Sequence, residues 1–180
     1  EEEYDAEIRV GGRIRRLTGN LDRVDWREQE DPEGAIDEGA VILDYKTGRI
    51  KALRPDIWAD DAFWDALDPE KAAEAASEPD PEHDFLPIMA QRIPTVQLLY
   101  YCYLYGQATG KPALGEDGGE RPLFGKGMTI EERERALSLI PRLIGFILLH
   151  MELCPEFRPR EGAHCRWCSW RNVCIISSQQ

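Results

Sequence analysis

A short apolar run that ends in charged residues is the feature that most constrains the fold of this 180-residue chain. The run reads Ala-Val-Ile-Leu at positions 40–43, and Asp44, Tyr45 and Lys46 follow it directly. An unbroken apolar strand is typical of the centre of a sheet that is covered on both faces. Residues two apart in a strand lie on the same side, so Asp44 and Lys46 are expected to project together. Charged groups on a buried strand are costly unless they are paired, bound to a metal or used in chemistry.

Asp22 offers a second carboxylate for the same place. It lies in the segment 13–25, which is predicted to be the preceding strand. Two carboxylates and one ammonium group form a pocket suited to a divalent cation and a phosphate, the minimum needed for metal-assisted hydrolysis of a phosphodiester bond. Solvated surface charges are the alternative interpretation of the same three residues.

The acidity of the chain is concentrated in one stretch. The formal net charge is −12, which is unusual for a nucleic-acid-binding protein. Residues 55–84 hold eleven acidic residues and one basic residue, so the remainder of the chain is close to neutral. We expect this stretch to be an acidic, partly helical insertion. The overall charge then argues only weakly against a nucleic-acid partner.

The rest of the pattern predicts one α/β domain over residues 1–180. Strands are expected at 7–10, 13–25, 40–46 and 49–53, with a Gly11-Gly12 turn between the first two. Helices are expected at 94–105 and 129–153, separated by a glycine-rich loop at 111–127. Thr129 and Glu132 form a capping-box pattern at the start of the second helix.

The chain shows no apolar stretch of about 18 residues and no signal peptide, which predicts a cytoplasmic protein without a membrane span. It begins with Glu1 rather than methionine, so we expect it to be a fragment of a longer gene product.

Three motifs in order add a resemblance to a known family. They are Gly19-Asn20-Leu21-Asp22-Arg23, Asp44-Tyr45-Lys46-Thr47-Gly48, and Gln97-x-x-x-Tyr101. In this order they resemble the RecB-like branch of the PD-(D/E)XK nuclease superfamily, over nearly the whole chain. The resemblance implies a restriction-endonuclease-like α/β core, in which a central mixed β-sheet is flanked by helices on both sides. A C-terminal cysteine-cluster tail, residues 154–180, would follow this core.

The resemblance implies a catalytic metal site in the pocket described above. Asp22 and Asp44, with the carbonyl of Tyr45, would be the ligands of Mg²⁺ or Mn²⁺, ions that prefer oxygen ligands. Lys46 would orient or activate the attacking water and offset the charge that develops on the phosphate.

The same resemblance assigns roles to three further residues. Gln97 and Tyr101 lie one helical turn apart and so face the same way; they would support the site and touch the DNA backbone. Ordinary helix packing is the alternative for this pair. Glu7 stands where many relatives place an acidic residue on the preceding strand, so an accessory ligand and a solvated strand residue are both open.

The cysteines indicate a second metal site. Three of the five crowd near the C-terminus, at Cys165, Cys168 and Cys174. An odd count in this arrangement suits a cytosolic metal site better than a disulfide framework. Three thiolates are one short of a closed site, and Cys154 or His164 would complete a zinc site. Cys102 lies in an apolar helix and is expected to be a buried thiol.

The terminal cysteine triple also resembles the iron–sulfur branch of the RecB-like nucleases, the AddB-type subunits and the CRISPR-associated RecB-like exonucleases. There it joins one distant N-terminal cysteine to hold a [4Fe-4S] cluster that staples the domain. Zinc, and a tail without metal, are the alternatives.

The function implied is a Mg²⁺- or Mn²⁺-dependent deoxyribonuclease. It would act as an exonuclease on single-stranded or unwound DNA ends, in repair and recombination or in CRISPR adaptation. A helicase domain or subunit is a candidate partner. Two other functions stay open: a catalytically silent DNA-binding or scaffolding module of a helicase–nuclease complex, and a zinc-bearing interaction domain with no role on DNA.

Overall fold

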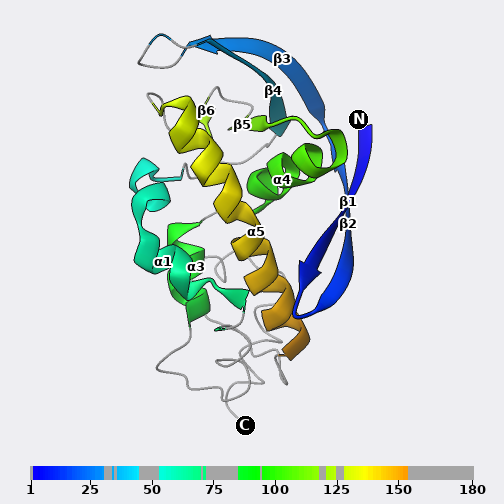
Figure 1. Ribbon diagram of the computed structural model, residues 1–180, viewed down its shortest axis with the longest axis vertical. Coiled ribbons are helices and arrows are strands. Elements are labelled where there is room, and N and C mark those ends of the chain that lie inside the picture. The colour runs from blue at the N-terminus through cyan, green and yellow to red at the C-terminus, as the bar shows by residue number, and fades with distance from the viewer. Residues whose placement is uncertain are drawn as a thin grey trace, which may run out of the picture.

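The computed structural model describes residues 2–30, 34, 36–44, 53–69, 71, 85–93, 95–117, 121–124 and 128–153 (Figure 1). Its strands are β1 (Glu2–Val10), β2 (Arg13–Leu21), β3 (Arg23–Glu30), β4 (Ile36–Asp44), β5 (Ala113–Asp117) and β6 (Arg121–Pro122). Its helices are η1 (Pro55–Ala59), α1 (Asp61–Ala66), α3 (Phe85–Arg92), α4 (Gln97–Thr109) and α5 (Ile130–Leu153). The fold is α/β, as expected, whereas the cysteine-cluster tail and most of the expected strand at 49–53 lie outside the described residues.

β1 and β2 form the antiparallel hairpin that the Gly11-Gly12 pair predicts. Both glycines have positive φ, 56° and 73°, which a two-residue type I′ turn requires. The inner face of the hairpin buries four apolar residues against α4 and α5, namely Ile8, Val10, Leu17 and Leu21.

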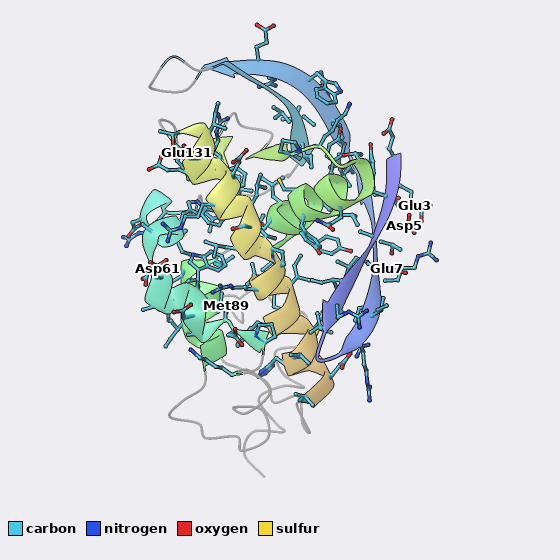
Figure 2. All side chains as sticks on the ribbon, in the orientation of Figure 1. Glu3, Asp5, Glu7, Asp61, Met89 and Glu131 are labelled. Atoms are coloured by element: carbon cyan, nitrogen blue, oxygen red, sulfur yellow. The ribbon has the colours of Figure 1, made fainter. Side chains whose placement is uncertain are left out.

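The outer face of this hairpin is charged. Glu3, Asp5 and Glu7 point away from the helices (Figure 2), and Asp5 is paired with Arg16 at 3.0 Å. Among the residues that the structure describes, helices therefore cover one face of the hairpin. The alternation of charged and apolar residues along β1 accounts for this, because one face of an antiparallel pair can remain solvated.

The segment 13–25, expected as one strand, is two strands that meet at Asp22. β2 ends at Leu21 in the hairpin with β1, while β3 begins at Arg23 and pairs with β4. The second sheet has the order β3-β4-β5-β6, and only β4 and β5 are parallel, so it is mixed as predicted. The chain bends at Asp22 because the strand changes its partner there.

Residues 111–127, expected to form a loop, contain β5 and β6. β5 lies parallel to β4, and its Ala113, opposite Ala40, is fully buried. The positive φ of Gly110, 71°, ends α4 and lets residues 110–112 lead directly into β5. The glycine and polar residues of this segment predict a loop. Pairing with β4 nevertheless stabilises a short strand there.

The described part of the acidic stretch 55–84 belongs to the core. η1 and α1 bury five apolar residues, Ile57, Trp58, Phe63, Trp64 and Leu67. Trp58 and Trp64 stack with ring centroids 5.5 Å apart, and the indole of Trp64 donates a hydrogen bond to the carbonyl of Ile57 at 2.8 Å.

The acidic side chains of this stretch form ion pairs with arginines of neighbouring helices. The pairs are Asp60 with Arg92 at 2.5 Å, Asp61 with Arg135, and Asp65 with Arg142 at 3.0 Å. Arg92 lies on α3 and the other two arginines on α5, beside α1 on the left of Figure 1. Part of the negative charge of the stretch is thus neutralised within the fold.

α5 is the central helix. Its capping box is confirmed: the Glu132 amide donates to Thr129 Oγ1 at 3.2 Å, and the Thr129 amide donates to the Glu132 carboxylate at 2.9 Å. By length and composition α5 is apolar enough to cross a membrane, a property that the sequence reading missed. Its apolar side chains, among them the fully buried Ile140 and Leu143, instead form the core of the domain.

The burial of α1 gives a stability prediction. Trp64→Ala should lower the free energy of unfolding by about 3–5 kcal/mol, because it leaves a large cavity. The matched control is Trp26→Ala, since Trp26 is 56% exposed on β3, and a change within about 0.5 kcal/mol is expected. Urea denaturation followed by circular dichroism measures both. Similar small losses for the two variants would contradict the packing of α1 in the core.

Candidate active site

The register of the second sheet brings the backbones of Asp22 and Asp44 together. β3 and β4 pair Val24 with Ile42 and Arg23 with Leu43, and one further step reaches Asp22 and Asp44. Directly opposed residues in such a ladder have Cα atoms about 5 Å apart. The two aspartates therefore occupy neighbouring positions at the bend between the sheets, where Asp22 is exposed.

Asp117 occupies the neighbouring position on the other side of β4. The parallel register of β4 and β5 makes Asp44 and Asp117 partners. Sequence reasoning missed this residue, because it placed Asp117 in a loop. The described backbone thus carries Asp44 and Asp117 at paired positions of two adjacent strands, and Asp22 lies at the bend before a third strand, β3.

Some of the predicted residues lie outside the described part of the chain. They are Tyr45, Lys46, the Asp44 side chain and the cysteines at 154, 165, 168 and 174. Within the residues whose side chains are described, no group of three or more His, Cys, Asp or Glu forms a metal site. The ligand set Asp22, Asp44 and Tyr45 therefore stays a prediction.

Gln97 and Tyr101 are brought together on the first turns of α4. The Gln97 side-chain amide donates a hydrogen bond to the Tyr101 hydroxyl at 2.9 Å. Gln97 is exposed and Tyr101 is half-buried, so the pair presents polar atoms at the surface of α4.

Gly19 positions this end of α4 against β2. A Cβ atom at Gly19 would lie 3.0 Å from Leu104 Cδ2, 3.2 Å from Tyr101 Cε1 and 3.4 Å from Tyr100 Cε1. Only a residue without a side chain allows the helix to approach so closely. Gly19 is three residues from Asp22, roughly 10 Å along a strand. The glycine of the Gly-x-x-Asp-Arg motif thus fixes the helix that carries Gln97 and Tyr101 against the strand that leads to Asp22.

Tyr100 adds a hydrogen bond to the same contact. Its hydroxyl donates to the carbonyl of Thr18 at 2.8 Å, and burial raises its pKa, which keeps the donor protonated. On the opposite strand, burial and a hydrogen bond to Glu2 raise the pKa of Tyr4 to about 12. The hydroxyl groups of Tyr4 and Tyr100 therefore stay protonated at neutral pH.

Cys102, on the buried side of α4, is a free thiol that is 1% exposed. Burial raises its pKa well above the usual range for cysteine, so it stays protonated and unreactive. The prediction of a buried core thiol is confirmed.

Glu7 is not brought to the site. It is opposite Arg16 in the β1–β2 register, six residues along β2 from Asp22, which corresponds to roughly 20 Å. Its side chain points outward from the hairpin (Figure 2). The structure therefore supports the solvated strand residue rather than the accessory ligand.

The arginine that follows Asp22 is held by its own strand. Arg23 Nε lies 2.7 Å from Asp25 Oδ1, and Arg27 Nη2 lies 3.7 Å from the other oxygen of the same carboxylate. Two guanidinium groups thus share one carboxylate beside the bend at Asp22.

Comparison with protein families shows that the model of the PD-(D/E)XK nuclease superfamily matches residues 1–175. This chain belongs to the PD-(D/E)XK nuclease superfamily. Members of this superfamily are generally nucleases and typically use Mg²⁺ or Mn²⁺. Searches of curated proteins and of solved structures gave no match.

The PD-(D/E)XK assignment agrees with the α/β architecture and with the ligand type predicted from the sequence. Aspartate oxygens from adjacent strands are the ligands that Mg²⁺ and Mn²⁺ prefer. The signal for Gly19 was present in the sequence as a glycine inside a strand, which often marks a close backbone approach. No comparable signal identified Asp117.

The packing at Gly19 in this nuclease domain gives a second prediction. Gly19→Ala should lower the free energy of unfolding by about 1–3 kcal/mol, because the methyl group forces α4 away from β2. Gly106→Ala is the matched control within α4: its Cβ would meet only the Lys111 carbonyl, at 3.6 Å. Alanine favours a helix over glycine by up to about 1 kcal/mol, so this variant should be neutral or stabilised. Equal stability of the two variants would contradict the close approach.

Proposed function

We propose that this nuclease domain is a Mg²⁺- or Mn²⁺-dependent deoxyribonuclease that hydrolyses phosphodiester bonds at the bend between its two sheets. The observation that supports the proposal is the β3–β4 register, because its last pair, Arg23 with Leu43, is adjacent in the chain to Asp22 and Asp44. Membership of the PD-(D/E)XK superfamily supports the same reading.

The proposed ligands are the carboxylates of Asp22 and Asp44 and the carbonyl of Tyr45. A divalent cation bound there supplies Lewis-acid stabilisation of the phosphate and lowers the pKa of a coordinated water. Lys46 follows Asp44 by two residues, so its ammonium group is available to orient the attacking water and to offset charge on the phosphate.

Gln97 and Tyr101 are proposed to bind the DNA backbone beside the cleaved bond. Their hydrogen bond holds both polar groups in one orientation. The contacts at Gly19 and Thr18 support the helix that carries them. A pre-positioned pair of donors costs little entropy when the phosphate binds.

The proposed substrate is DNA with single-stranded or unwound ends, cleaved exonucleolytically. The contexts proposed are repair and recombination, with a helicase domain or subunit as partner, or CRISPR adaptation, in the cytoplasm. The negative charge of the chain does not oppose this, because residues 55–84 carry most of it and three of their aspartates are paired with arginines.

The carboxylate assignment is tested by substitution. Asp44→Asn, Asp22→Asn and Lys46→Ala should each reduce cleavage of a labelled single strand in Mn²⁺ by at least about 100-fold, since each removes charge at the reacting phosphate. The control is Glu3→Gln, on the exposed outer face of β1, which should cleave like the wild type. Binding in EDTA should persist in every variant. Full cleavage by Asp44→Asn would refute the assignment, and wild-type binding without any cleavage would favour a silent scaffold.

We propose further that Cys165, Cys168 and Cys174 hold a structural [4Fe-4S] cluster with a fourth cysteine. The motif supports it, because three thiolates within ten residues provide the ligand type that such clusters use. Zinc is the alternative ion for the same thiolates.

The cluster is tested spectroscopically. Protein purified without oxygen should be brown, with absorbance at about 400 nm from the sulfur-to-iron transitions of a cluster. Cys168→Ser should lose this band. Cys102→Ala should keep it, because Cys102 is buried in α4 and unreactive. If the protein is colourless and contains zinc, the cluster proposal is refuted and the three cysteines hold zinc instead.

A further inference from the structure

Trp26 on β3 differs from the other tryptophans that the structure describes. It is 56% exposed, whereas Trp58 and Trp64 are 4% and 1% exposed. The other large exposed apolar side chains among the described residues are aliphatic or methionine. Because tryptophan is highly buried on average, an exposed indole in the middle of a strand suggests a role other than packing.

Lys111 lies over this indole. Its ammonium nitrogen is 4.6 Å from the centroid of the Trp26 ring. Lys111 follows Gly110, the C-cap of α4, whereas Trp26 lies on β3, so two separate parts of the chain supply the pair. An exposed cation–π contact is weak. A flat π-surface beside a cation is, however, the combination with which proteins bind single-stranded nucleic acid, through base stacking and phosphate contact.

The pair is attached rigidly to the candidate active site. Trp26 is four residues after Asp22, roughly 13 Å along the strand. Regular pairing with β4, Trp26 opposite Ala40, fixes its position.

We propose that Trp26 and Lys111 form a stacking site for a base of single-stranded nucleic acid whose backbone continues to Asp22 and Asp44. The inference rests on the proposed function, because the course of the strand is argued from the position of that site. Trp26 would stack on the base, and Lys111 would contact the adjoining phosphate.

Binding of a fluorescein-labelled oligothymidylate in EDTA, followed by anisotropy, tests the stacking site without cleavage. Trp26→Ala should raise Kd by about 5- to 100-fold, the range for loss of one stacked base, and Trp26→Phe should restore most of the affinity. Lys111→Gln should reduce the slope of log K against log salt by about 0.7, the value for one phosphate on a single strand. The matched control is Ile14→Ala: Ile14 is 54% exposed on β2, and its loss should leave Kd unchanged.

The outcomes separate this inference from the proposed function. If Trp26→Ala binds the oligonucleotide as the wild type does, or if Trp26→Phe is as weak as Trp26→Ala, the stacking site is refuted. If the Trp26 and Lys111 variants weaken binding as expected while the wild type cleaves nothing in Mn²⁺, the stacking site stands and the nuclease proposal fails. If the wild type cleaves DNA while Trp26→Ala leaves Kd unchanged, the nuclease proposal stands and the stacking site is refuted.

Discussion

The close contact of α4 with β2 at Gly19 is the interaction on which the geometry of the site depends. The hairpin β1–β2 belongs to one sheet and β4 to another, so hydrogen bonds within a sheet do not relate them. α4 packs on both hairpin strands and on β4 and β5. Because Gly19 has no side chain, Tyr101 and Leu104 rest almost on the strand backbone. The helix thereby holds Gln97 and Tyr101 at a defined distance from the bend at Asp22.

The net charge of the chain does not describe how charge is distributed in this domain. The chain is strongly acidic, yet aspartates of η1 and α1 are partners of arginines on α3 and α5. Exposed ion pairs of this kind add little stability individually. Their effect here is to offset the charge of these carboxylates, which lie on the side of α5 away from the hairpin.

Several elements were predictable because local chemistry alone determines them. Gly11 and Gly12 specify the hairpin turn, Thr129 and Glu132 specify the start of α5, and the apolar run before Asp44 specifies β4. The expectation that Asp22 and Asp44 act together came from the order of the motifs, because the sequence contains no distances. The same motifs located Gln97 and Tyr101, whose hydrogen bond the structure then supplied.

The errors arose where the tertiary context decides. The break at Asp22 reflects a change of strand partner, which no residue preference encodes, and β5 is stabilised by its neighbour β4 in spite of its glycine. The burial of Trp58 and Trp64 could not be predicted from composition. Composition does not distinguish the side of this segment that faces α5 from the acidic side that faces water. The sequence assigned Glu7 to the correct strand, but it did not contain the register of that strand. In the observed register Glu7 is opposite Arg16, which lies six residues from Asp22 along the chain.

The salt bridge between Arg15 and Glu152 has a consequence for how the chain is made. Two hydrogen bonds, of 2.5 and 2.7 Å, join the guanidinium of Arg15 in β2 to the carboxylate of Glu152 at the end of α5. The hairpin leaves the ribosome before α4 and α5, which cover its apolar face. Folding therefore involves contacts of large sequence separation, which form slowly. During synthesis the nascent hairpin exposes both an apolar face and unpaired strand edges, the features that recruit chaperones and favour aggregation.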